Sequence, residues 1–300
     1  MLETSPEPRL EQSLTRFTRR SFLLGSGAVL AAGGLALYSS EVARHEISIV
    51  TQTIAIRRLP EAFENLRVVQ ISDIHFDEYT EPSFVQRIVD HVNRLTPDLL
   101  LLTGDFVSYG PLPVSFGAQA APLCANVLRG LQCPQRYAVM GNHDTVVGVP
   151  LIIEALAHAN IPVLLNNFVP IERDGQRIWL SGVADPASSK PDLYYAIPPH
   201  PDGPILLMAH APDYADVVVA HPRGHLVDFM LSGHSHGGQV RLPIIGPLVL
   251  PPMGRKYVEG LFHLDRLQLY VNRGIGAVGL PFRLNCPPEI TIFTLKNSVN

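Results

Sequence analysis

Apolar and polar positions along this chain follow two periods, one typical of strands and one typical of helices. Short, almost wholly apolar runs bounded by turn residues predict strands that are buried on both faces of a sheet. Residues 82–95 instead repeat apolar side chains at helical spacing, and Pro82 suits the first turn of a helix. The buried strands are expected at residues 66–72, 98–103, 136–140, 205–209 and 226–231.

The remaining elements are less sharply defined. Residues 46–56 alternate like a half-buried edge strand, and an Asp-Gly turn at 174–175 predicts a hairpin over 171–181. Strands that alternate with helices and then give way to a strand-rich second half predict an α/β layered domain with two central sheets. Further expected elements are helices at 118–130 and 149–159, a short strand at 163–165, and antiparallel strands within 257–295.

The N-terminal part resembles a targeting signal. Arg19 and Arg20 precede an uncharged run from Phe22 to Tyr38, an order that resembles a twin-arginine (Tat) export signal. A membrane anchor is the alternative, because the run approaches the roughly 17–25 residues that span a bilayer. No small-x-small cleavage site follows it, so retention as an anchor stays open. We expect residues 1–44 to be a Tat-like signal or anchor and residues 45–300 the functional domain.

A Tat signal implies a bacterial or archaeal protein that meets the Tat export machinery and crosses the membrane already folded. We therefore expect it in the periplasm or at the outer face of the cytoplasmic membrane, with membrane contact through the N-terminal segment.

Composition narrows the functional classes. With 300 residues, 46% hydrophobic and 17% charged, the chain can bury a substantial core. A net charge of -4 gives no basic surplus, so no nucleic-acid partner is indicated. Cys124, Cys133 and Cys286 lack Cys-x-x-Cys spacing, which argues against a zinc ribbon. Three buried free thiols are expected, and a Cys124–Cys133 bridge is the alternative in an oxidising compartment.

Carboxylate, imidazole and amide side chains follow five of the predicted strands. Ligands of open α/β sheets bind outside the carboxyl ends of the strands, so these side chains are expected to share one site. Oxygen and nitrogen ligands without thiolates favour Mn, Fe or Zn. Any one of them alone is more often a helix cap or a turn former, but that account would have to repeat at every strand end. The residues are Asp73, His75, Asp105, Asn142, His143, His210, His234 and His236.

The order of these residues resembles the motif set of the calcineurin-like metallophosphoesterases. The resemblance implies a four-layer α/β/β/α sandwich with two central mixed sheets. It rests on Asp73-x-His75, Gly104-Asp105, Gly141-Asn142-His143-Asp144, a lone His210 after a strand, and Gly233-His234-x-His236.

The resemblance also implies a dinuclear site for two divalent metal ions, with Mn, Fe and Zn as the candidates. A hydroxide that bridges both ions would be the nucleophile. His143 would lie beside the ions without ligating them, oriented by Asp144, to stabilise phosphoryl oxygens or protonate the leaving group. One ion would be held by Asp73, His75 and His236, the other by Asn142, His210 and His234, and Asp105 would bridge them.

The implied activity is hydrolysis of phosphoesters, and we expect a phosphodiesterase or pyrophosphatase that acts near the membrane on small-molecule or lipid-linked substrates, nucleotide lipids among them. A phosphomonoesterase or phosphoprotein phosphatase is the alternative enzyme, and a non-catalytic metal-stabilised scaffold is the alternative outside catalysis.

The apolar, proline-rich residues 242–253 could line a lipid site or touch a membrane. We favour a buried connector to the second sheet, the commoner role of apolar runs.

Overall fold

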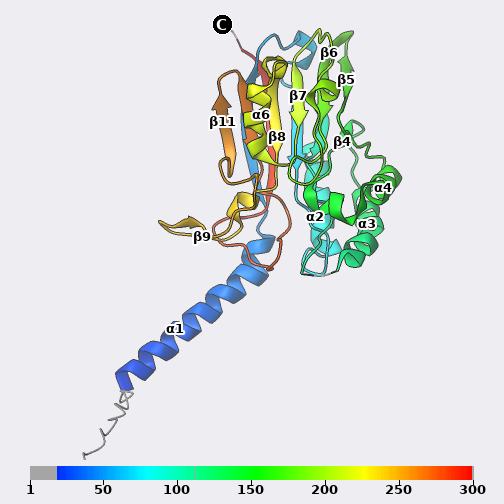
Figure 1. Ribbon diagram of the computed structural model, residues 1–300. Helices are drawn as coiled ribbons and strands as arrows, with labels where there is room; N and C mark the ends of the chain where they lie inside the picture. Colours follow the sequence, from blue (N-terminus) through cyan, green and yellow to red (C-terminus); the bar gives the residue numbers. More distant parts are fainter. Residues whose placement is uncertain (1–18, 112, 299–300) are drawn as a thin grey trace, which may run out of the picture. The chain divides into compact units, whose positions relative to one another are not determined.

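The computed structural model describes residues 19–111 and 113–298 and divides into two compact units, one ending at Tyr38 and one running from Ser39 to Asn300 (Figure 1). Helix α1 (Arg19–Leu37) belongs to the first unit. Together with the short turns that follow it, the helical segment Arg19–His45 is 27 residues long. Its length and composition suffice to cross a membrane, although signal sequences near an N-terminus have the same properties.

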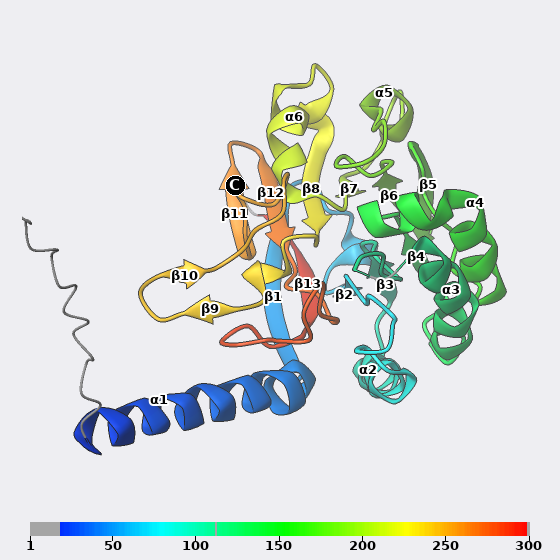
Figure 2. The same ribbon diagram turned by 60° about the horizontal axis from the view of Figure 1, so that its bottom comes forward.

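The second unit contains two large mixed sheets. In the first, β2, β3 and β4 are parallel, and β13 lies between β1 and β2, parallel to β1 and antiparallel to β2 (Figure 2). The predicted edge position of residues 46–56 is confirmed. The order of this sheet is β1 (Ser48–Ile56), β13 (Glu289–Asn297), β2 (Arg67–Ile71), β3 (Leu99–Leu102) and β4 (Arg136–Ala138).

In the second sheet, β6, β7, β8 and β12 are parallel and an antiparallel strand lies at each edge. The predicted hairpin is confirmed, since β5 and β6 join through Asp174 and Gly175, both at positive φ. The order is β11 (Gly260–Leu264), β12 (Leu267–Val271), β8 (Val227–Ser232), β7 (Ile205–Met208), β6 (Gln176–Gly182) and β5 (Asn167–Arg173).

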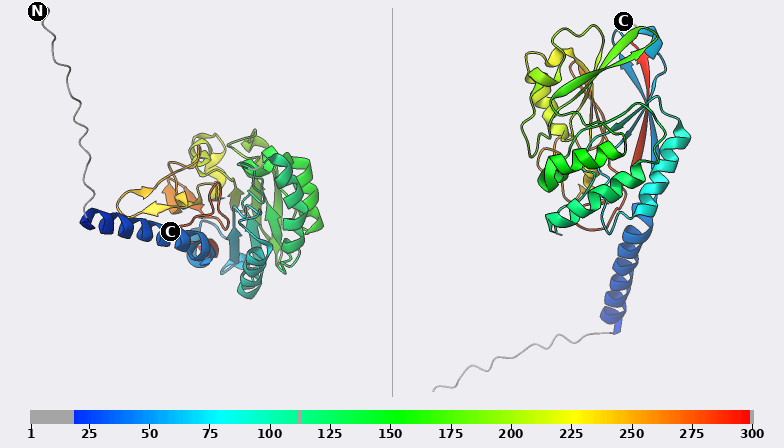
Figure 3. Two further views of the ribbon diagram at one scale, coloured as in Figure 1. Left: turned by 90° about the horizontal axis from the view of Figure 1, so that it is seen from below. Right: turned by 90° about the vertical axis from the view of Figure 1, so that its right-hand side faces the viewer.

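Strand β3 shows how the layers form. Side chains of a strand alternate between faces. Leu100 and Leu102 belong to the core under helices α2 (Pro82–Leu95), α3 (Val114–Leu128) and α4 (Asn142–His158), while Leu99 and Leu101 belong to the core between the two sheets. Helices α5 (Leu193–Ala196) and α6 (Ala215–Ala220) cover the outer face of the second sheet (Figure 3). The predicted four-layer α/β/β/α architecture is confirmed.

Several predicted boundaries were wrong. Helix α3 begins at residue 114 rather than 118 and accommodates Pro122. Helix α4 begins at Asn142 rather than at residue 149, and a kink at Gly148, where φ is 137°, divides it into two helical stretches. Residues 163–165 form an isolated bridge from Val163 to Ala138 instead of a strand. In the tail, β12 and β13 each find a parallel partner far away in sequence, which local alternation does not reveal.

The interpretation of residues 242–253 as a buried connector was also wrong. This segment carries the small hairpin of β9 (Arg241–Leu242) and β10 (Gly246–Pro247), which pairs outside both large sheets. Ile244 at its tip is fully exposed, and Ile245 is 71% exposed. The three cysteines are free and buried, as expected.

Candidate metal centre and active site

The predicted site residues meet at the carboxyl ends of β2, β3, β4, β7 and β8. Most of the Asp and His residues among them have a left-handed backbone, which turns their side chains inward from the strand ends. A non-glycine residue in this conformation costs on the order of 1 kcal/mol and persists where surrounding structure enforces it. The residues at positive φ are Asp73, His75, Asp105, His234 and His236.

Glycines let these loops approach one another. A Cβ atom at Gly141 would overlap the carboxylate of Asp105, and one at Gly233 would overlap the side chains of Ser72 and Asp73. The motif glycines are therefore required by close packing of the loops around the carboxylates.

A first ligand group comes from the two outer motifs. The ligand atoms of Asp73, His75 and His236 all lie within 4.8 Å of one another. The Nε2 atoms of His75 and His236 are 3.0 Å apart, and His236 Nε2 is 3.5 Å from Asp73 Oδ1. All three side chains are buried.

A second group lies beside it. The ligand atoms of Asp105, His210 and His234 meet the same 4.8 Å limit, and so do those of His75, Asp105 and His143, which overlap with both groups. His210 Nε2 is 3.1 Å from Asp105 Oδ2 and 3.2 Å from His234 Nδ1. Asp105 Oδ2 also lies 3.5 Å from His75 Nε2 in the first group, so this carboxylate faces both groups.

Outer contacts orient the imidazoles. His210 Nδ1 lies 2.7 Å from the Thr103 carbonyl, and His234 Nε2 lies 2.8 Å from the Pro252 carbonyl. A carbonyl oxygen can only accept, so each of these nitrogens carries a proton and donates. In a neutral ring the other nitrogen then presents its lone pair to the centre, the usual arrangement of metal-binding histidines.

Burial controls the charges. It lowers the pKa of His75 and of His236 well below the ordinary value, so both rings are neutral. Burial raises the pKa of Asp73 to about 6. For His210, burial favours the neutral ring, but the charge and hydrogen bond of Asp105, with the charge of Asp73, outweigh it and raise the pKa.

The residues present fit divalent cations. Two neutral ring nitrogens 3.0 Å apart aim at the same space as two buried carboxylates. The Oδ1 atom of Asn142 is buried and has no hydrogen-bond partner within the described parts of the chain. Orphaned acceptors of this kind are costly unless a cation or water satisfies them. Nitrogen and oxygen donors without sulfur suit Mn, Fe or Zn.

The hydrogen bonds of Asp144 differ from the prediction that it orients His143. Its carboxylate accepts from the backbone N–H groups of Asp105, Phe106 and Gly141, at 2.8, 2.9 and 3.0 Å. It therefore ties the second and third motif loops together. Burial and the Asp105 charge raise the pKa of Asp144 to about 8, against the effect of these amides.

His143 is oriented by another group. Its Nδ1 atom accepts from the backbone N–H of Tyr109 at 3.0 Å, and the Tyr109 ring lies 4.4 Å from its own. The proton of the neutral ring is thus on Nε2. Burial lowers the pKa of His143, which keeps the ring neutral.

One carboxylate near the centre was missed by the sequence analysis. Asp185 follows β6, the neighbour of β7, and is fully buried. Its Oδ2 accepts from Ser188 at 2.6 Å, while Oδ1 has no partner among the described residues. Its charge works against the burial that lowers the pKa of His143, and it adds to the larger effect of Asp105 that raises the pKa of His210. The strand-end rule that identified the other residues applies to it, but β6 had been assigned only to a hairpin.

The centre opens into a cavity of about 540 Å³. Asp105, Asn142, His143, His234 and His236 lie in its floor, and apolar side chains supply much of its wall. The apolar members are Val240, Leu248, Val249, Pro251, Val278, Leu280 and Phe282.

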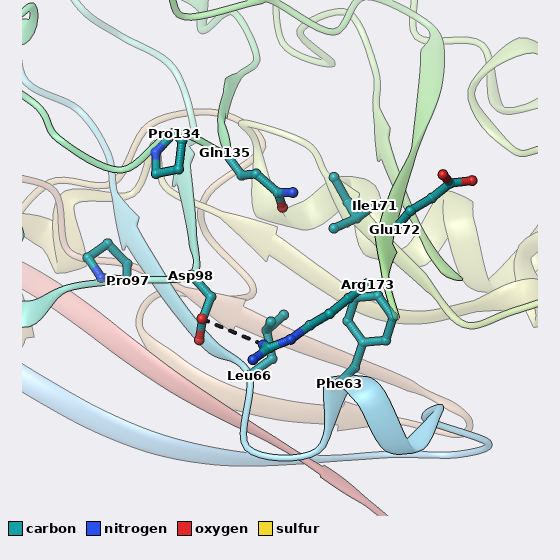
Figure 4. A pocket seen from close by; sticks show the side chains of 9 residues that line it. All are labelled: Phe63, Leu66, Pro97, Asp98, Pro134, Gln135, Ile171, Glu172 and Arg173. Atoms are coloured by element: carbon teal, nitrogen blue, oxygen red, sulfur yellow. Dashed lines mark ion pairs between the residues drawn. The ribbon is translucent and has the colours of Figure 1, made fainter. Parts of the chain in front are cut away.

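A second cavity, of about 300 Å³, lies at the opposite ends of the strands (Figure 4). Leu66, Asp98 and Gln135, each directly before a strand of the first sheet, line it together with Arg173, which pairs with Asp98 at 3.6 Å. It contains none of the predicted site residues.

Comparison with known proteins decides the family. The model of the calcineurin-like phosphoesterase family matches residues 66–238, from the start of β2 through the His-x-His turn. The chain belongs to the calcineurin-like phosphoesterases. This family uses divalent metals, and the chain is accordingly a metal-dependent phosphoester hydrolase.

Two relatives of this calcineurin-like phosphoesterase match it over nearly their whole length. Metallophosphoesterase YkuE of Bacillus subtilis is 32% identical over 95% of this chain and 100% of its own. Phosphodiesterase YaeI of Escherichia coli is 31% identical over 93% of this chain and 99% of its own. The solved structure of Haemophilus influenzae NAD nucleotidase covers 70% of this chain and 45% of its own, with 16% identity and a TM-score of 0.46.

Proposed function

We propose that this phosphoesterase is a dinuclear phosphodiesterase or pyrophosphatase. Asp73, His75 and His236 would hold one ion, and His210, His234 and Asn142 the other. Asp105 would be shared, since its carboxylate faces both ligand groups. The observation that carries the proposal is the pair of adjoining ligand groups at the floor of a cavity large enough for a substrate.

When bound, two divalent cations supply Lewis-acid activation of a phosphoryl oxygen and lower the pKa of water toward about 7. The chain's own residues then position the substrate. The Nε2–H of His143 donates to a phosphoryl oxygen or passes its proton to the leaving oxygen. The Tyr109 amide and the Asp144 carboxylate hold His143 and the Asp105 loop in place.

The walls of the cavity favour substrates with an apolar part. Val240, Val278 and Phe282 stand beside the ligand groups, where a second ester substituent of a diester would extend. We propose lipid-linked phosphodiesters or pyrophosphates, nucleotide lipids among them, as the substrate class.

The test uses the full chain with Mn²⁺. We expect hydrolysis of bis-p-nitrophenyl phosphate, abolished by chelation and strongly reduced by Asp105→Asn and by His143→Ala. A clear preference for p-nitrophenyl phosphate would replace the diesterase with the phosphomonoesterase. Absence of metal-dependent turnover on both esters would favour a non-catalytic scaffold.

We also propose export by a Tat-like signal and action at the outer face of the cytoplasmic membrane, supported by Arg19 and Arg20 at the start of the otherwise apolar helix α1. A reporter fused to residues 1–44 should be exported, and replacing both arginines with lysine should stop its export. Continued export of the lysine variant would contradict the Tat assignment.

A further inference from the structure

The mouth of the metal cavity carries an exposed apolar surface, which we call the apolar rim. It consists of Ile244, Ile245, Leu248, Val249 and Leu280, with exposed fractions of 108, 71, 51, 77 and 64%. Leu248, Val249 and Leu280 also line the cavity, so the apolar wall continues from the metal centre out to solvent. Contiguous exposed apolar surface of this kind marks an interaction site.

Two segments form the rim, and hydrogen bonds join them into one surface. The Arg241 N–H donates to the Leu284 carbonyl at 2.9 Å, and the Leu284 N–H donates to the Gln239 carbonyl at 3.0 Å. The Gln239 side-chain amide donates to the carbonyls of Val278 and Leu280 at 3.1 and 2.9 Å. The β9–β10 hairpin and the loop at 276–282 are therefore held together.

The rim contains no charge to desolvate. Residues 242–250 and 276–282 include no Asp, Glu, Lys, Arg or His. Soluble protein partners usually meet a surface with a polar rim and hydrogen-bonding groups. An uncharged hairpin tip with two adjacent isoleucines better suits the boundary between lipid headgroups and acyl chains, into which apolar side chains insert by roughly 5–10 Å.

The chain enters the domain at the same loop. The carbonyl of Ser39, the first residue of the second unit, accepts from the Arg283 N–H at 3.1 Å. Ser39 comes two residues after the end of α1 and lies within the helical segment Arg19–His45, which is long and apolar enough to cross a membrane. The loop that supplies Leu280 to the rim is thus hydrogen-bonded, through Arg283, to the first residue of the second unit.

We propose that the apolar rim inserts into the surface of a lipid bilayer, and that the acyl part of a lipid-linked substrate passes along Leu248, Val249 and Leu280 into the metal cavity. The insertion stands on the rim itself, whereas the passage of substrate rests on the proposed phosphodiesterase function. Insertion of the rim would then favour substrates that reside in the bilayer, while the metal centre selects the bond to be cleaved.

Insertion is measured with the full chain in vesicles of phosphatidylethanolamine and phosphatidylglycerol. Because the three native cysteines are buried, a fluorophore can be attached selectively to Ile245→Cys. The matched control is Glu172→Cys. Glu172 is exposed on β5 and lines the second cavity, which lies at the amino ends of the first-sheet strands. Nitroxide groups high on the acyl chains should quench the label at 245 about threefold more than the label at 172.

Equal quenching at the two positions would overturn the proposal. A second result would also overturn the proposal: the emission of the label at 245 shifts with protein concentration in detergent but does not change when lipid is added. The rim would then be covered by a second copy of the chain.

Substrate passage is measured separately. The double change Ile244→Asp and Ile245→Asp should raise KM for a diacyl lipid-linked diester in vesicles by about tenfold. It should leave hydrolysis of bis-p-nitrophenyl phosphate unchanged, as should the control Val217→Asp at an exposed position of α6. An unchanged KM for the lipid ester would refute the passage. If no variant hydrolyses bis-p-nitrophenyl phosphate, the phosphodiesterase function fails, while the quenching still decides the insertion.

Discussion

The two ends of the central strands both carry a cavity, yet they are built differently. At the carboxyl ends, buried carboxylates and imidazoles face one another within 4.8 Å. At the amino ends, the charged pair is Arg173 with Asp98, whose side chains are 46 and 39% exposed. The buried charges at the carboxyl ends must be neutralised by a cation or by one another, whereas water screens the exposed charges at the amino ends. A cavity alone therefore does not identify a site.

Backbone conformation separates the two ends further. Toward the amino ends, positive φ occurs at Asn65, Thr96 and Asn160, next to turns and helix ends where such residues commonly adopt it. At the carboxyl ends it falls on ligand-type Asp and His residues. Strain is retained there because it directs side chains into the centre.

The sharpest test exchanges one carboxylate for an amide at each end. Asp105→Asn should lower kcat/KM on bis-p-nitrophenyl phosphate by about a thousandfold, since it removes several kcal/mol of charge stabilisation at about 1.4 kcal/mol per tenfold. Asp98→Asn should leave the rate unchanged. Similar losses in both variants would erase the distinction between the ends.

Metal bound at the carboxyl ends of the strands should stabilise the folded protein. At a Mn²⁺ concentration about a hundred times Kd, the free energy of unfolding should rise by about 2.7 kcal/mol. Urea unfolding with and without Mn²⁺ measures this, and Asp105→Asn should lose most of the increase. An equal increase in that variant would place the metal elsewhere.

The metal effect should depend on pH. Asp73, whose pKa is raised to about 6, keeps its proton in the metal-free protein below that pH, and His210 also has a raised pKa. A cation must displace these protons, so the stabilisation should shrink as the pH falls through about 6, and above that pH it should still grow while His210 gives up its proton. Proton uptake on Mn²⁺ binding, in place of proton release, would contradict this assignment.

Asp185 allows a finer test within the carboxyl end. Asp185→Asn keeps the shape of the side chain but removes a buried negative charge near His143 and His210. Mn²⁺ affinity should fall by about 10- to 100-fold, the size typical of outer partners of a metal site. Titration of the metal-free protein measures it, and the exposed control Asp202→Asn should bind Mn²⁺ normally. Unchanged affinity would make Asp185 a structural residue only.

The smallest effect belongs to the amino end. Arg173→Ala should change the free energy of unfolding by less than about 1 kcal/mol, because the partly exposed pair with Asp98 is screened by water. Activity should be unaffected. A larger loss in urea unfolding, or any loss of turnover, would show that this cavity has a function.

The sequence was sufficient where local pattern and chemistry coincide. Short apolar strands followed by Asp, Asn or His predicted both the layers and the residues that meet in the centre. It was insufficient where pairing is distant: nothing near Leu267 indicates a parallel partner in β8. The sequence also did not reveal that apolar residues such as Ile244 are exposed, because an apolar run is more often buried. Nor did it reveal that the backbone amide of Tyr109, rather than Asp144, donates a hydrogen bond to His143.

The position of β13 has a consequence for biosynthesis. Strand β1, near the start of the second unit, is hydrogen-bonded in its sheet to β13, whose residues 289–297 are made much later than β1. Translation runs from the N-terminus, so β1 leaves the ribosome before β13 has been made, and β1 can join the sheet only once β13 is available. Throughout that interval the N-terminal segment is already available to whatever recognises it.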